Sequence, residues 1–169
     1  MAITTTQITD TAGIRLKKDA CVVVITTEWN AHVVNKLDEG CLEVLREHHV
    51  AIKQIKVPGA FEITFAIKDY WEKTKYNHCK PDAFIALGCI IKGDTPHFEY
   101  VCNAVTEGIL ALNLQLPVPS IFGVLTVNTQ EQADERTGGI HGHKGKEAAA
   151  TAIKMIALSQ SFITHPTSV

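Results

Sequence analysis

A threonine, a proline and a histidine stand together between an apolar run and a helical pattern. The segment reads Gly88-Cys-Ile-Ile-Lys-Gly-Asp-Thr-Pro-His97. Proline suits the first position of a helix and threonine suits the N-cap, so we expect a helix to begin at Thr95 and Pro96. The amide groups of such a helix start can hold a phosphate or an oxyanion, and the helix dipole disfavours the cationic form of His97. The segment therefore predicts an anion site and a proton-transfer group within one helical turn.

Two aromatic residues are candidates to stack on a flat heterocycle. Trp29 follows the first apolar run and Phe122 lies inside a later one. For Trp29, packing and ligand binding are equal alternatives, whereas an aromatic inside an apolar strand is more often a core residue. Glu62 follows Pro58-Gly59, where it either accepts hydrogen bonds from ligand hydroxyls or favours the helix dipole as a first-turn acid.

A third group of candidates follows the last apolar run. Arg136 carries a guanidinium fork that matches a phosphate, although a cation near a helix C-terminus is also a common structural feature. His141 and His143 supply only half of a metal site. We expect no metal there.

Composition excludes several classes of protein. The chain has 169 residues, a formal net charge of −2 and no basic run, which argues against nucleic acid or an anionic membrane as partner. Its five cysteines never form C-x-x-C, so we expect reduced, buried thiols. No signal peptide or transmembrane run is visible, and the cytoplasm is the expected location. The G-x-G-x-x-G, Walker A and G-x-S-x-G motifs are missing, which disfavours dinucleotide, nucleoside triphosphate and acyl-serine chemistry.

The elements that must position these residues alternate between strand and helix patterns. We expect strands over 21–26, 51–57, 83–87 (ending on a glycine turn at Gly88) and 121–127, and helices near 33–45, 60–74, 101–112 and 144–161. A short helix should open at Thr129 and end at Gly138-Gly139. This order predicts one α/β domain, a three-layer α/β/α sandwich with a mainly parallel four-stranded sheet. Ligands bind outside the carboxyl ends of such strands, where we place residues 27–30, 57–62, 88–97 and 121–123.

Taken together, these segments resemble the lumazine synthase family, whose members make 6,7-dimethyl-8-ribityllumazine in riboflavin biosynthesis. The resemblance covers the chain from about Ile14 onward. It is carried by Trp29-Asn30, Val57-Pro-Gly-Ala-Phe-Glu-Ile63, residues 88–101, Ile121-Phe-Gly-Val-Leu-Thr126, Glu131-Gln-Ala-Asp-Glu-Arg136 and His143-Lys-Gly145. It implies a flavodoxin-like fold over residues 14–169, with residues 1–13 as a mobile tail or as a strand added to a neighbouring subunit.

The resemblance also implies the reaction and its residues. The family joins 5-amino-6-(ribitylamino)uracil to 3,4-dihydroxy-2-butanone 4-phosphate without a cofactor. It implies that Trp29 stacks on the pyrimidine, and that Phe122 closes that pocket from a neighbouring subunit, with Lys144 near the same interface. The ribityl chain would be held by Ala60, Phe61 and Glu62, and the pyrimidine edge by Cys89, Ile90 and Ile91. The phosphate would be bound by Asp94, Thr95 and Arg136, with His97 moving protons.

Some features depart from the family or leave alternatives open. Trp29 stands where many relatives have Phe, and His143 stands where Asn is common before Lys-Gly. Asp94 would repel a phosphate dianion unless the contact comes through its backbone N–H. The family implies a pentamer, in some members a shell of sixty chains, and riboflavin synthase is a candidate partner. A non-catalytic flavin-binding or shell protein on the same scaffold is the alternative, and a flavodoxin-like electron carrier is disfavoured because no Ser/Thr-rich loop follows the first strand.

Overall fold

Four parallel strands form the central sheet of the structure, a computed structural model that describes residues 8–78 and 80–164. Their order is β2-β1-β3-β4, so the chain starts inside the sheet and builds outward to both edges. The strands are β1 (Cys21–Thr27), β2 (Ala51–Val57), β3 (Ala83–Ile91) and β4 (Ser120–Val127). A helix connects each strand to the next, as parallel pairing requires.

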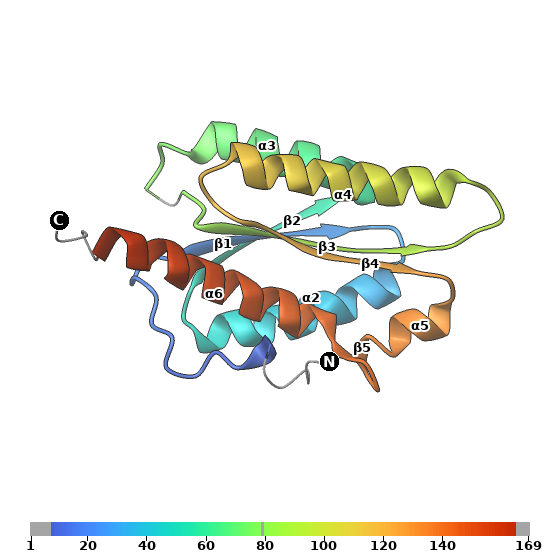
Figure 1. Ribbon diagram of the computed structural model, residues 1–169, viewed down its shortest axis with the longest axis horizontal. Coiled ribbons are helices and arrows are strands. Elements are labelled where there is room, and N and C mark those ends of the chain that lie inside the picture. The colour runs from blue at the N-terminus through green and yellow to red at the C-terminus, as the bar shows by residue number, and fades with distance from the viewer. Residues whose placement is uncertain (1–7, 79, 165–169) are drawn as a thin grey trace.

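Helices cover both faces of this sheet (Figure 1). One face carries α2 (Ala31–Glu47) and α6 (Lys144–Thr164). The other carries α4 (His97–Gln115) and α3 (Ile63–Thr74), which follows a 3-10 turn at Ala60–Glu62. The predicted three-layer α/β/α sandwich is confirmed, and its strand order is that of a flavodoxin-like sheet without the fifth strand. Within the described residues, no helix is both long and apolar enough to cross a bilayer.

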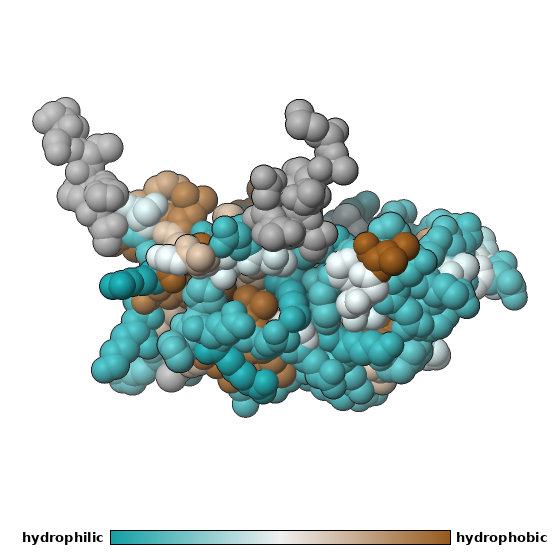
Figure 2. Space-filling model, turned by 90° about the horizontal axis from the view of Figure 1, so that it is seen from below, coloured by the Kyte–Doolittle hydropathy of each residue, from teal (hydrophilic) through white to brown (hydrophobic). Residues whose placement is uncertain are grey.

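The core lies against both faces of β1 and β3. All seven residues of β1 and the first seven of β3 are buried, which explains why neither strand alternates polar and apolar residues. On the α2 and α6 side, small residues let the helices approach closely: a Cβ on Gly145 would lie 2.8 Å from the carbonyl carbon of Leu37. Seen from that side, the outer surface is mostly hydrophilic (Figure 2). The outer face of α2 is polar, whereas α6 also exposes large apolar residues towards its end, namely Leu158, Phe162 and Ile163.

The prediction that β3 ends on a glycine turn is wrong. The strand continues through Gly88 to Ile91, and it stays paired with β4 as far as Val127. Gly88 serves close packing instead, since a Cβ there would lie 3.3 Å from Cγ2 of Thr27 and 3.5 Å from Cγ1 of Val124. A glycine after an apolar run can mark either a turn or a closely packed position inside a strand. Only the neighbouring strands decide between these two roles.

The segment after β4 begins as predicted and ends differently. The hydroxyl of Thr129 caps α5 (Gln130–Asp134), accepting from the amide of Gln132 at 3.3 Å. The helix ends at Asp134, well before the two glycines, which lie in β5 (Thr137–Gly139) and pair with β6 (Gly142–His143). The reason is the positive φ of +117° at Gly138, which turns the chain into a small ribbon.

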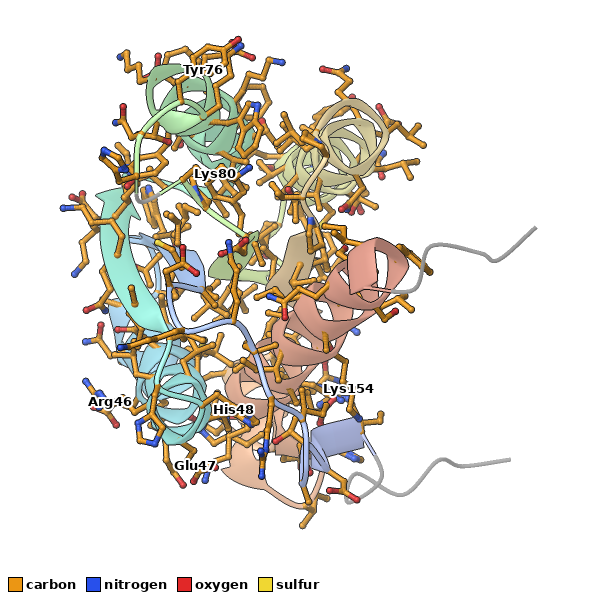
Figure 3. All side chains as sticks on the ribbon, turned by 90° about the vertical axis from the view of Figure 1, so that its left-hand side faces the viewer. Arg46, Glu47, His48, Tyr76, Lys80 and Lys154 are labelled. Carbon is orange, nitrogen blue, oxygen red and sulfur yellow. The ribbon has the colours of Figure 1, made fainter. Side chains whose placement is uncertain are left out.

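The N-terminal segment packs on α6 where it is described. Residues 1–7 lie outside the described residues, while Ile8 and Thr9 are helical and the Ile8 carbonyl accepts from Nζ of Lys154 at 2.7 Å. Figure 3 views this contact from the end where the strands begin, with Lys154 on α6 and Arg46, Glu47 and His48 at the end of α2. A strand donated to a neighbouring subunit and the division at residue 13 stay predictions.

Candidate active site

A cavity of about 520 Å³ opens at the carboxyl ends of β1, β2 and β3. The segments that follow these strands meet there because parallel strands end at the same edge of the sheet. Its lining consists of Trp29, Asn30, Gly59, Ala60, Phe61, Glu62, Cys89, Ile90, Ile91, His97 and Val101. The structure therefore brings together His97 and seven of the eight residues that the sequence assigns to the pyrimidine and ribityl groups.

Backbone hydrogen bonds fix the wall that carries Trp29. The amide of Glu28 donates to the Val57 carbonyl at 2.9 Å, and that of Trp29 donates to the Pro58 carbonyl at 3.2 Å. Gly59 lies between two site residues: a Cβ there would be 3.1 Å from Oε2 of Glu62 and 3.5 Å from Cδ1 of Trp29. The indole itself is 74% exposed, so its face is open to a ligand.

Asn30 is a site residue that the sequence analysis missed. Its backbone is left-handed, with φ 56° and ψ 40°, at the N-cap of α2. Its side-chain amide Nδ2 donates to the Cys89 carbonyl at 2.8 Å, which ties the end of β1 to the end of β3. Asparagine tolerates this backbone better than most residues. An Asn directly before a helical pattern was the available signal. Gly59, which was expected at this edge without a role of its own, and Val101, which was not assigned to the site, also line the cavity.

The start of α4 differs in detail from the prediction. The helix begins at His97, and Pro96 (φ −62°) stands at its N-cap without a side-chain cap. In the described part of the chain, no backbone acceptor meets the amides of His97 and Phe98, and no hydrogen bond engages the Thr95 hydroxyl. Thr95 is thus not the N-cap, because proline occupies that place. The donors expected of an anion site remain available, and His97 is exposed beside them.

The predicted phosphate residues lie outside the cavity on two segments that start from adjacent strands. The amide of Lys92, just after β3, donates to the carbonyl of Val127 at the end of β4, at 2.9 Å. Asp94 and Thr95 follow on the first segment and are exposed. Arg136 follows on the second, where Nη1 donates to the Gln132 carbonyl at 2.8 Å and lies 3.8 Å from Oε2 of Glu135. The Arg136 guanidinium is therefore held against α5 and its side chain is 30% exposed.

Phe122 does not lie at this edge of the sheet, and that placement was wrong. It is the third residue of β4, five residues before the strand ends at Val127, which corresponds to about 17 Å. The alternative of a core position is also wrong, since Phe122 is 42% exposed. Within one chain, Phe122 and the cavity beside Trp29 are separate features.

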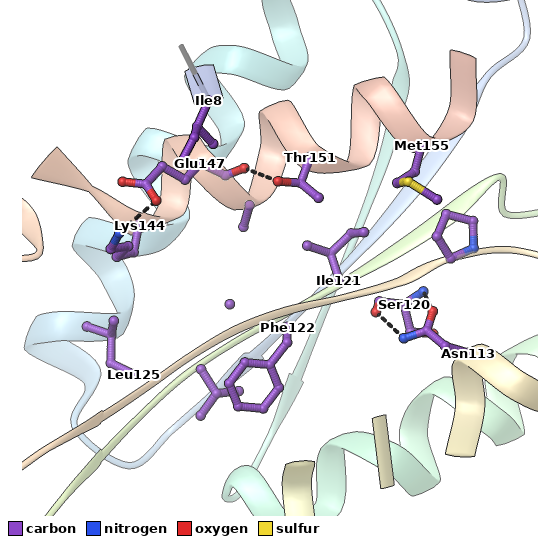
Figure 4. Close-up of a pocket in the computed structure, with 14 residues that line it drawn as sticks. Ile8, Asn113, Ser120, Ile121, Phe122, Leu125, Lys144, Glu147, Thr151 and Met155 are labelled. Carbon is purple, nitrogen blue, oxygen red and sulfur yellow. Dashed lines mark hydrogen bonds and ion pairs between the residues drawn. The ribbon is translucent and has the colours of Figure 1, made fainter. Parts of the chain in front are cut away.

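Phe122 lines a second cavity of about 530 Å³ along the open edge of β4 (Figure 4). Lys144 lines it too, with Nζ 2.7 Å from Oε2 of Glu147. Among the described residues, Oγ of Ser120 and Oε1 of Glu147 are buried here without a hydrogen-bond partner. Buried polar atoms of this kind are rare in a finished structure. This face is therefore incomplete in the single chain.

The cysteines and the possible metal ligands limit the reactions that this site can perform. Burial raises the pKa of the Cys89 thiol to about 11, so it is neutral at physiological pH and a poor nucleophile. Cys21 and Cys41 are likewise buried, as predicted, whereas Cys102 is only half-buried and departs from that prediction; Cys79 falls outside the described residues. Across residues 8–78 and 80–164, no three His, Cys, Asp or Glu side chains gather where they could hold a metal ion.

Comparisons with known proteins agree on one family. A family model described as 6,7-dimethyl-8-ribityllumazine synthase matches residues 19–160. A relative of that name from Parabacteroides distasonis is 47% identical over 139 residues, covering 80% of this chain and 84% of the relative. One from Porphyromonas gingivalis is 46% identical over 146 residues, covering 85% and 88%. One from Flavobacterium johnsoniae is 41% identical over 153 residues, covering 88% and 78%.

Proposed function

Because the chain belongs to the 6,7-dimethyl-8-ribityllumazine synthase family, we propose that it is the transferase that joins 5-amino-6-(ribitylamino)uracil to 3,4-dihydroxy-2-butanone 4-phosphate. The products are 6,7-dimethyl-8-ribityllumazine, phosphate and water. The observation that carries the proposal is the 520 Å³ cavity, in which an aromatic platform, a carboxylate and a histidine converge. The alternative, a non-catalytic flavin-binding or shell protein, is not favoured, because His97, Thr95 and Arg136 are all present.

In this proposal the cavity binds the pyrimidine and its ribityl chain. The exposed indole of Trp29 stacks on the ring. Backbone groups of Cys89, Ile90 and Ile91 meet the pyrimidine edge, and the hydrogen bond from Asn30 keeps the Cys89 carbonyl in place. The ribityl hydroxyls bind along Ala60, Phe61 and Glu62, whose side chains or backbone line the same wall.

The phosphate of the second substrate binds between the segments after β3 and β4. The amides at the start of α4, the backbone N–H of Asp94 and the Thr95 hydroxyl are donors on one side. Arg136 contributes the charge on the other side, and its fork matches two phosphate oxygens. The helix start adds a favourable dipole for an anion.

The reaction needs proton transfers and no electron acceptor. The aromatic amine attacks the ketone and loses water to give an imine; a proton then leaves carbon and the phosphate is eliminated. The second nitrogen closes the ring and expels water. His97 relays the protons, while the donors around the phosphate stabilise the charge that develops on the leaving group. Holding both substrates side by side adds a large effective molarity.

The site is completed by a second copy of the chain. Phe122 lies about 17 Å along β4 from the edge that carries the cavity, so it serves the site of a neighbour. Lys144 lines the same face, and the unpartnered Ser120 and Glu147 atoms there are ready to meet a partner. We propose a homo-oligomer, a pentamer with the option of a shell of sixty chains. The short ribbon of β5 and β6 leaves room for docking between pentamers.

Location and a further partner belong to the same proposal. Free buried thiols such as Cys41 and Cys89 suit a reducing compartment, the cytoplasm. Riboflavin synthase, which acts on the lumazine product, is the proposed protein partner. Its association is tested by light scattering of the assembled protein with and without it, and an unchanged mass would remove it.

The direct test mixes the purified protein with both substrates, without added metal or cofactor. We expect the absorbance and fluorescence of the lumazine to appear, with phosphate released one for one. Product that forms only after a metal or cofactor is added would contradict the proposed mechanism. No product together with tight riboflavin binding would move the protein to the flavin-binding class.

A further inference from the structure

His143 lies at the start of α6 and bonds to its first turn. Its ring atom Nδ1 accepts from the backbone N–H of Lys146 at 3.4 Å, and α6 begins at Lys144. A side chain that accepts from the amide three residues ahead is the geometry of an N-cap. Imidazole is an unusual cap, because Nδ1 accepts only while it carries no proton.

The ring is wedged against α2. A Cβ on Gly40 would lie 2.7 Å from Nδ1 of His143, so only glycine leaves room for the imidazole there. In the first turn of α6, Gly145 lies directly on the backbone of Leu37. Nζ of Lys146 reaches Oε1 of Glu43 on α2 at 2.7 Å. These contacts fix the start of α6 relative to α2 through the histidine.

The same short segment reaches two residues of the proposed site, Arg136 and Lys144. Lys144 follows His143 directly, and its backbone N–H donates to the carbonyl of Arg136 at 2.9 Å. His143 is also paired with Thr137 in the ribbon of β5 and β6, immediately after Arg136. A change in the orientation of His143 is therefore transmitted to the backbone of both residues.

We propose that His143 is a positioning residue, which caps α6 in its neutral form and thereby holds Arg136 and Lys144 in place. The substrate roles of Arg136 and Lys144 rest on the proposed function, whereas the cap rests on the geometry around His143. The substitution His143→Asn offers a specific comparison, because asparagine is also a good N-cap. Asparagine can accept the same hydrogen bond but does not titrate.

The surrounding charges keep the imidazole neutral near physiological pH. Burial and the nearby Lys146 ammonium lower the pKa of His143 below its usual range, against a backbone hydrogen bond at His143 and the carboxylates of Glu43 and Glu147, which raise it. The positive end of the α6 dipole at this helix start acts in the same direction. Because the folded pKa is depressed, the contribution of the cap to stability is complete above the unfolded pKa of about 6.5 and is lost as the pH falls below it.

The test compares His143→Asn, which keeps the acceptor, with His143→Ala, which removes it. His141→Asn in the exposed turn of the same ribbon is the matched control. At pH about 7.5 we expect His143→Ala to raise the KM for the butanone phosphate about five-fold, with kcat less affected, and His143→Asn to restore the wild-type value. As the pH falls to about 5.5, the KM of the wild type should rise relative to that of His143→Asn. Using this ratio cancels pH effects on the substrate and on the rest of the site.

A second readout does not depend on turnover. Without substrates, the unfolding midpoint of the wild type should fall relative to His143→Asn as the pH drops below about 6.5. Inorganic phosphate should raise the midpoint of the wild type and of His143→Asn more than that of His143→Ala. Identical midpoints for all variants at every pH would overturn the cap. Changed midpoints with an unchanged KM and phosphate response would overturn the positioning role. A wild type that binds phosphate in this pattern but makes no lumazine would refute the proposed reaction and leave the cap supported.

Discussion

Arg136 and His97 occupy different surroundings, and this difference separates their proposed tasks. Arg136 is bonded to the carbonyl of Gln132 and keeps 30% of its side chain exposed, as suits a fixed charge that waits for an anion. His97 is exposed beside the cavity at the first turn of α4, as suits a group that must move protons between atoms of a bound substrate. Single substitutions should therefore affect binding in one case and turnover in the other.

Arg136→Ala should raise the KM for the butanone phosphate about ten- to a hundred-fold, since a hydrogen bond to a charged group is worth about 1.5–3 kcal/mol. The KM for the pyrimidine substrate should change little, because Arg136 lies outside the cavity. Steady-state kinetics with each substrate varied in turn measures both values. Arg136→Lys keeps the charge but lacks the planar guanidinium fork. Its KM for the butanone phosphate should therefore lie between those of the wild type and of Arg136→Ala. An unchanged KM for the phosphate substrate would remove Arg136 from that role.

His97→Ala should lower kcat about a hundred-fold or more, the usual contribution of a general acid–base group, and should leave both KM values near those of the wild type. His78→Ala, at an exposed position in the loop before β3, is the control and should be fully active. Single-turnover measurement of lumazine formation separates chemistry from product release. Full turnover by His97→Ala would show that water or another group carries the protons.

At the scale of elements, the packing of α6 on α2 depends on Gly145. Alanine is normally the better helix former by about 0.5–1 kcal/mol, but a Cβ here would press on the carbonyl of Leu37. We expect Gly145→Ala to lower the free energy of unfolding by about 2–3 kcal/mol, as overpacking does elsewhere. Denaturant unfolding measures the change.

Gly93→Ala is the matched control, because no atom lies within 4 Å of a Cβ at this position. It should be neutral or slightly stabilising, by at most about 1 kcal/mol. Equal effects of the two substitutions would show that the helices can separate without cost.

The elements that the sequence predicted well are those with a continuous pattern. The buried run Cys21 to Thr26 and the alternating run Ala51 to Val57 each match an observed strand to within a residue. The errors fall at glycines and at element ends, where a residue type has two meanings. Gly88 looked like a turn and lies inside β3, and Gly138 turns a ribbon instead of ending a helix.

The site was predictable to the extent that it follows strand ends. The segments that carry Trp29, Glu62 and His97 follow strands with apolar patterns, and topology alone brings such segments together. The role of Asn30 could not be read in advance, because its partner is the carbonyl of Cys89, a residue far away in sequence. The placement of Phe122 at the carboxyl edge was wrong because the residue lies near the start of β4. Only residues near the end of a strand reach that edge.

At the scale of the whole molecule, the two cavities predict that variants can complement one another. His97→Ala damages the cavity at the carboxyl edge, and Phe122→Ala damages the face along β4. If each site combines one face from each of two neighbours, a random mixture of the two variants restores about a quarter of the sites. Each variant alone should stay impaired.

Co-refolding equal amounts of the two variants and measuring lumazine formation tests this. Mixing without unfolding is the control, since assembled subunits should not exchange quickly. Activity no higher than the mean of the two separate variants would show that each chain builds its site alone.

The distance between Phe122 and the cavity also has a consequence for counting sites. If a site combines faces of two neighbours, as proposed, each chain offers one half of a site at each of two different faces, and the contacts run head to tail. In a closed ring every half meets its complement, and the number of working sites equals the number of chains. An open fragment of any length always has one site fewer than it has chains. Ring closure therefore completes the last catalytic site as well as the assembly. A lone chain carries both halves of a site on different faces but forms no complete site.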